Sequence, residues 1–66
     1  MTPADFKAAR LALGLNGAEA ARVMGYGNVS RIYNLEARGE VPPQAARLMQ
    51  AYLDGYRPAD WPQKPA

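Results

Sequence analysis

Cysteine and histidine are both absent from this chain of 66 residues, and their absence excludes several kinds of chemistry. Without cysteine the protein has neither a disulfide bond nor a thiolate nucleophile. Without histidine, zinc, copper and haem lose a usual ligand, and general base catalysis loses its commonest side chain. The six carboxylates are spread along the chain rather than paired: Asp5, Glu19, Glu36, Glu40, Asp54 and Asp60. We therefore expect a protein that is not an enzyme and needs no metal or cofactor.

Long apolar runs are also missing. No run approaches the roughly 20 residues that a membrane-spanning helix requires, and the opening MTPADFKAAR lacks the apolar stretch of a secretion signal. A chain this short buries only about 60% of its unfolded surface, so one small domain with a modest core is expected. The net charge of +2 is compatible with a polyanionic partner, but it becomes informative only if the basic residues share one face.

Capping signals divide the first 55 residues into four expected helices, which predicts a compact all-α domain. Thr2 with Asp5, and Asn16 with Glu19, have the spacing of a capping box, and Asn28 can cap a third helix. Glycines near the helix ends suit the left-handed conformation that commonly terminates a helix. The expected helices span about 3–13, 17–24, 29–37 and, from the proline pair at 42–43, up to residue 54.

The last residues, YRPADWPQKPA, hold three prolines and no helical periodicity, which predicts an extended proline-rich tail over residues 56–66 after a domain over residues 1–55. Tyr56 and Trp61 in this tail either pack back on the domain or bind a partner.

The segment NVSRIYNLEARG, residues 28–39, has an outward face that differs from an ordinary solvated helix. On a helical wheel Ile32 and Leu35 face the core, whereas Ser30 and Asn34 project to the opposite side. A solvated face more often carries lysine and glutamate four residues apart, and asparagine and serine are poor formers of a helix interior. Asparagine can bond bidentately to adenine, and serine can bond to several base edges. The helix is therefore either a reader of DNA bases or a solvated face without a partner.

Candidate DNA contacts come from this helix and from the helix before it. The candidates for base contacts are Val29, Ser30, Arg31, Tyr33 and Asn34. The candidates for phosphate contacts are Asn16, Gly17, Asn28, Arg22 and Arg38, with Arg31 and Arg47 as further arginines. Because Gly17 has no side chain, a phosphate could come close to the free N–H groups at the start of its helix. The alternatives are a plain N-cap at Asn16 and ordinary solvation of the arginines.

A structural ion pair is also predicted. Arg10 lies on the core side of the first expected helix, and Glu36 lies on the core side of the third. A largely buried arginine requires a carboxylate partner. We therefore expect Arg10 and Glu36 to pair and to hold these two helices together.

The sequence LGLNGAEAARVMG, residues 13–25, followed by NVSRIYNLEARG, resembles the helix-turn-helix core of the phage repressor and Cro family, often called Xre-type. The matching features are Leu13-Gly14-Leu15 before Asn16, Ala18-Glu19, Ala21, Gly25, Ile32, Leu35-Glu36 and Gly39. The resemblance covers residues 3–53 and implies a lambda-repressor-like domain that binds operator DNA as a homodimer. It places base contacts at Val29, Ser30 and Asn34, and the family's arginine–glutamate pair at Arg10 and Glu36.

The chain departs from that family in four places. Ala20 replaces the usual larger leucine, so a thinner core is expected there. Many relatives have, at the position of Gly17, a glutamine that reaches a phosphate, so this contact is lost or taken over by the backbone. The turn GYGN is one residue longer than usual, which could bring Asn28 or Arg31 to the bases. The proline-rich tail stands where many relatives have a dimerising helix. The dimer candidates are therefore Tyr52, Tyr56 and Trp61, although core packing is the favoured alternative for Tyr52.

We accordingly expect a sequence-specific transcriptional repressor of phage, prophage or mobile-element type that binds a palindromic operator in double-stranded DNA. It would act in the cytoplasm of a bacterial cell or phage-infected host. The alternative is an antitoxin or operon autoregulator whose tail binds a partner protein. A protein-interaction module without DNA binding is less favoured, because the outward face of the third helix carries no bulky acidic side chain.

Overall fold

The computed structural model describes residues 1–62, and within this range it contains four helices and no strand. The helices are α1 (Pro3–Ala12), α2 (Gly17–Met24), α3 (Val29–Ala37) and α4 (Pro43–Leu53). The predicted all-α fold is confirmed. The second and third helices have the expected bounds. The first and fourth each end one residue early, because Leu13 and Asp54 are the C-caps and the glycines that follow them have positive φ.

Each of the first three helices begins at a side-chain cap. Thr2 and Asp5 form a reciprocal capping box, in which each side chain accepts the other residue's backbone N–H. The hydrogen bond that the Thr2 backbone N–H donates to the Asp5 carboxylate lowers the pKa of that carboxyl. Asn16 and Glu19 form the second box, at 2.8 and 2.9 Å. The Asn28 side chain accepts the Ser30 N–H at 2.6 Å. Local sequence therefore determines where these three helices start.

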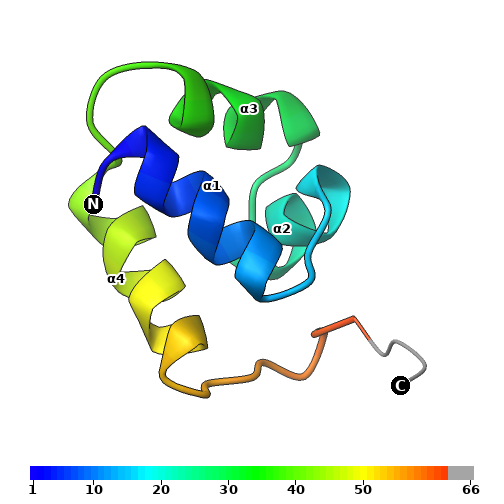
Figure 1. The fold of residues 1–66 in the computed structure, drawn as a ribbon. Helices are drawn as coiled ribbons and strands as arrows, with labels where there is room; N and C mark the ends of the chain where they lie inside the picture. Colours follow the sequence, from blue (N-terminus) through cyan, green and yellow to red (C-terminus); the bar gives the residue numbers. More distant parts are fainter. Residues whose placement is uncertain (63–66) are drawn as a thin grey trace.

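The core lies where α1 passes between α3 and α4. In Figure 1 α1 crosses the middle of the molecule, α3 lies above it and α4 below it, and α2 lies beside the end of α1. The largest fully buried side chains come from three helices: Phe6 from α1, Ile32 from α3, and Met49 and Tyr52 from α4. Because α3 is anchored from one side only, its other side faces solvent.

Arg10 and Glu36 form the predicted ion pair between α1 and α3. Arg10 Nε donates to Glu36 Oε2 at 2.7 Å, and Nη2 donates to Oε1 at 3.2 Å, so the contact is bidentate. The hydrogen bonds to Glu36 raise the pKa of the Arg10 guanidinium above its ordinary value. Arg10 Nη1 also donates to the Leu15 carbonyl oxygen at 2.9 Å. One side chain thus ties α1, the loop before α2 and α3 together.

The chain after α4 turns back far enough for Trp61 to pack on the domain. The Trp61 ring packs edge-on to Tyr52, with ring centroids 5.0 Å apart, and the Arg57 guanidinium lies 4.3 Å from the centroid of the Trp61 ring. Arg57 Nη1 also donates to the carbonyl oxygens of Tyr52 and Tyr56, at 2.7 and 2.8 Å. The remainder of the expected tail, residues 63–66, lies outside the described residues.

Candidate nucleic-acid interface

The two sides of α3 differ as the helical wheel predicts. Ile32 is 0% exposed and Leu35 is 6% exposed, so these side chains anchor the helix in the core. Ser30 and Asn34 are exposed on the opposite side. Val29, the first residue of the helix, is half-buried. The solvent-facing side of α3 therefore carries the short polar side chains of Ser30 and Asn34. The buried apolar side of α3 and the buried ion pair hold the helix in place.

Several polar side chains around this face have no hydrogen-bond partner within residues 1–62. These side chains are Ser30, Asn34, Arg22 and Arg38, and all four are exposed. A protein surface that binds a polar partner needs donors and acceptors that are not already used within the fold. The face therefore has hydrogen-bonding groups available to a ligand.

Arginines lie on both sides of this face. Arg31, Asn34 and Arg38 line one open hollow of about 360 Å³ along the flank of α3, together with Glu40. Arg22 and Asn28 line a second open hollow, of about 580 Å³, between α2 and the turn before α3. Arg31 and Arg38 thus share one hollow beside α3, and Arg22 lines the other.

Arg31, one of these three arginines, makes a further contact, whereas Arg47 lies elsewhere. Arg31 lies with its guanidinium 5.8 Å from the centroid of the Tyr26 ring, a cation–π distance that restrains its side chain beside the turn. Arg47 is exposed on α4 and lines neither hollow. Of the four candidate arginines, Arg47 is therefore the one that does not line a hollow beside α3.

Gly17 lies against α3. This glycine is buried, and a Cβ built on it would lie 2.7 Å from Tyr33 Oη and 2.9 Å from Val29 Cγ2. The space left by the missing side chain is therefore occupied by α3, and the contact of a phosphate with the backbone N–H groups at the start of α2 stays a prediction. Tyr33 is still 53% exposed, because only part of its ring rests on α2.

The two candidate asparagines at helix starts are partly committed to capping. The side-chain oxygens of Asn16 and Asn28 accept the N–H groups of Glu19 and Ser30. Both residues are exposed, so their side-chain amide groups can still donate to a phosphate.

The three dimer candidates have very different exposures. Tyr52 is 1% exposed, and its hydroxyl donates to the Val23 carbonyl oxygen at 3.0 Å. Burial raises the pKa of the Tyr52 phenol, which keeps it protonated as a donor. Tyr52 is thus a core residue and is not available to a partner on the surface. Trp61 is half-buried against it, whereas Tyr56 stacks on it at 6.0 Å and remains 55% exposed.

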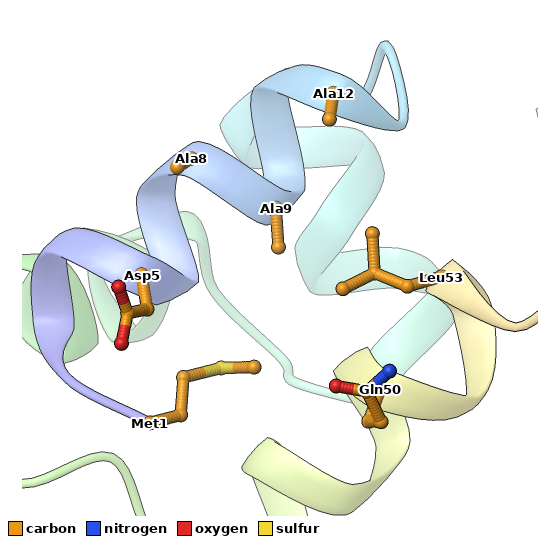
Figure 2. A pocket seen from close by; sticks show the side chains of 7 residues that line it. All are labelled: Met1, Asp5, Ala8, Ala9, Ala12, Gln50 and Leu53. Carbon is orange, nitrogen blue, oxygen red and sulfur yellow. The ribbon is translucent and has the colours of Figure 1, made fainter.

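A further open groove of about 520 Å³ lies between α1 and α4, away from α3. Figure 2 shows the side chains that line it: Met1, Asp5, Ala8, Ala9, Ala12, Gln50 and Leu53. Most of these side chains are small or apolar, and Asp5 supplies the only charged side chain. This groove is therefore unsuited to phosphate, in contrast to the hollows beside α3.

Residues 1–62 offer neither a cluster of metal ligands nor a membrane-spanning helix. These residues contain no group of three or more His, Cys, Asp or Glu that could hold a metal ion. None of the four helices is both long enough and apolar enough to cross a membrane.

Three functional or structural contacts were missed at the level of sequence. They are Arg10 with the Leu15 carbonyl, Tyr52 with the Val23 carbonyl, and Tyr33 with Gly17. The first two involve backbone oxygens, which carry no sequence signal. The third had a sequence signal, which is the glycine that opens a helix directly after the cap Asn16.

Comparison with known proteins gave no match. No protein-family model matches the chain, and no curated protein or solved structure is significantly similar to it.

Proposed function

We propose that the chain is a sequence-specific double-stranded DNA-binding protein, a transcriptional repressor of phage, prophage or mobile-element type, that reads the major groove with α3. The observation that carries the proposal is the solvent-facing side of α3. It presents the unpartnered side chains of Ser30 and Asn34, and Arg31 and Arg38 lie on its flank.

The chemistry of this face matches that of the major groove. The groove is wide enough for an α-helix, and adenine presents there an acceptor and a donor that an asparagine amide can bond together. Arginines beside such a helix can contact the phosphates, which positions the protein on the duplex. The buried anchor of Ile32 and the Arg10–Glu36 pair supports the rigidity that base reading requires.

A homodimer is part of the proposal, because one α3 supplies only a few base contacts. Two copies related by a two-fold axis would place their α3 helices about 34 Å apart, in successive major grooves of a palindromic operator. Tyr56 and Leu53, at the end of α4, are the exposed apolar side chains in this region of the fold, at 55% and 42% exposure. They replace Tyr52 as the candidates for contacts between the two copies.

The alternative remains an antitoxin or operon autoregulator whose tail binds a partner protein. For Trp61 to dock into a partner it would have to leave both Tyr52 and Arg57, which it contacts in the folded chain. This cost makes the DNA-reading function of α3 the better supported of the two.

The experiment that tests the proposal is selection of bound duplexes from a random library of about 30 base pairs. It should be carried out near physiological salt, where nonspecific binding to phosphates is weak. We expect an enriched inverted repeat whose half-site spacing corresponds to about one helical turn. An enriched single half-site would contradict the dimer, and the absence of any enriched sequence would contradict DNA reading as a whole.

Replacing Asn34 by alanine should relax base preference without unfolding the domain, because the Asn34 side chain is exposed and has no hydrogen-bond partner within residues 1–62. A bidentate contact contributes about 1–3 kcal/mol of discrimination against the wrong base. We expect the variant to lose this discrimination at one base pair of each half-site. Competition between duplexes that differ at that base pair measures the loss. Gln44→Ala is the matched control, since Gln44 is an exposed amide on α4. Unchanged preference in Asn34→Ala would remove Asn34 from the reading residues.

A further inference from the structure

Helices α2 and α3 approach each other closely at Gly17, the first residue of α2. A Cβ at this position would meet three atoms of α3 at under 3 Å: Tyr33 Oη at 2.7 Å, Tyr33 Cζ at 2.9 Å and Val29 Cγ2 at 2.9 Å. Gly17 does not have a positive φ, so the backbone conformation does not require glycine there. The requirement is one of space.

The two residues that fill this space belong to the part of α3 proposed to read DNA. Val29 is the first residue of α3, and Tyr33 lies one turn later on the same side. Ser30 and Asn34 each follow one of them directly in the sequence. A displacement of Val29 and Tyr33 away from α2 would therefore carry Ser30 and Asn34 with it.

Val29 is the harder of the two obstacles to move. Its β-branched side chain has one strongly preferred rotamer in a helix, so its methyl group cannot swing aside without a backbone shift. Tyr33 can rotate outward, but it would then give up its contact with α2 and lie over the exposed face of α3. An added methyl group at position 17 therefore changes the position of α3, the conformation of Tyr33, or both.

We propose that Gly17 is a specificity-determining residue that acts without touching a base, and that Tyr33 is a positioning residue seated on it. The absence of a Cβ at Gly17 lets the first turns of α2 and α3 lie in contact, which sets the direction in which Ser30 and Asn34 point. This inference rests on the proposed DNA-binding function. It is distinct from the two roles expected from sequence, a phosphate contact at Gly17 and a base contact at Tyr33.

Binding geometry explains why so small a change matters. Groups that recognise a ligand must be held within about 0.5 Å of their productive positions. Relieving contacts of 2.7 to 2.9 Å requires a movement that is comparable with this tolerance of about 0.5 Å. The arginines at positions 22, 31 and 38 contact phosphates through long, flexible side chains and tolerate such a shift, so nonspecific binding should be nearly unaffected.

The test compares Gly17→Ala with Gly27→Ala in the library selection. Gly27 is the matched control, because a Cβ there meets no atom within 4 Å and its φ is not positive. We expect Gly17→Ala to lose about tenfold in preference for the duplex selected by the unchanged protein, with nonspecific affinity retained. Gly27→Ala should behave as the unchanged protein does. Equal preference in both variants would overturn the inference while leaving the proposed function standing.

A second measurement covers the case in which Gly17→Ala folds poorly, and it needs no DNA. A double-mutant cycle on thermal stability combines Gly17→Ala with Tyr33→Ala. If Tyr33 occupies the space above Gly17, alanine at position 17 should lower the melting temperature less when Tyr33 is absent. Additive effects would show that the two residues are not in contact and would overturn the inference. If the unchanged protein selects no duplex at all, the proposed function fails and this inference fails with it.

Discussion

Replacing Arg10 by alanine is expected to destabilise the domain by about 3–5 kcal/mol, the range typical of removing one partner of a buried ion pair. The side chains of Arg10 and Glu36 are only 9% and 7% exposed, so the change leaves the Glu36 carboxylate buried without its cation. It also leaves the buried Leu15 carbonyl without the donor at 2.9 Å. A domain of this size has a total stability on the order of 3–10 kcal/mol. The variant should therefore lose a large part of the domain's stability.

Urea unfolding followed by circular dichroism measures this effect. Lys7→Ala is the control, because Lys7 lies on the same helix, is exposed, and should change stability by no more than about 0.5 kcal/mol. A double variant, Arg10→Met with Glu36→Leu, should be more stable than Arg10→Ala, since it leaves no buried unpaired charge. If Arg10→Ala melts like the unchanged protein, the ion pair does not hold α1 and α3 together in solution.

Replacing Tyr52 by alanine is expected to cost about 3–5 kcal/mol, as for other large aromatic residues removed from a core. Tyr52 is 1% exposed, and its ring supports both Tyr56 and Trp61. Its hydroxyl also joins α4 to the Val23 carbonyl oxygen at the end of α2. The loss should therefore loosen the tail as well as the core. Trp61, the only tryptophan in the chain, reports on the tail through its fluorescence.

Tyr52→Phe separates the hydroxyl from the ring. It should cost about 1–3 kcal/mol, because the Val23 carbonyl loses the donor that Tyr52 supplies while the packing of the ring is kept. The emission of Trp61 in the folded state should then match that of the unchanged protein, whereas in Tyr52→Ala it should shift towards that of a solvated indole. Equal stability of the phenylalanine and alanine variants would mean that the aromatic packing of the tail contributes little.

The helices of this protein could be predicted from sequence because their start signals are local. A cap such as Thr2 or Asn16 bonds to an N–H group three residues away, and Gly25 accepts a left-handed φ of 81° at no steric cost. The Arg10–Glu36 pair was also predictable, although it joins residues 26 apart in the chain. Its signal is the conflict between a charged residue and an apolar face, which only an opposite charge resolves.

The candidate interface was predictable only in part. The exposure of Ser30 and Asn34 follows from helical periodicity, because Ile32 and Leu35 must be buried. The position of Arg22, Arg31 and Arg38 in the hollows beside α3 does not follow from periodicity, since it depends on how α2 and the turn are placed against α3. Arg47, on α4, does not line either hollow beside α3.

The sequence by itself determined the four helices, the polar outward face of α3, and the need for an ion pair behind it. Each of these depends on hydrogen bonds, periodicity or charge that can be read along one segment or from one pair of residues. The tertiary structure alone decided that the Tyr52 hydroxyl bonds to the Val23 carbonyl, that Trp61 packs on the Tyr52 ring, and that Tyr33 and Val29 occupy the space above Gly17. These outcomes depend on the distance between helices, and that distance is set by close packing of all the side chains together.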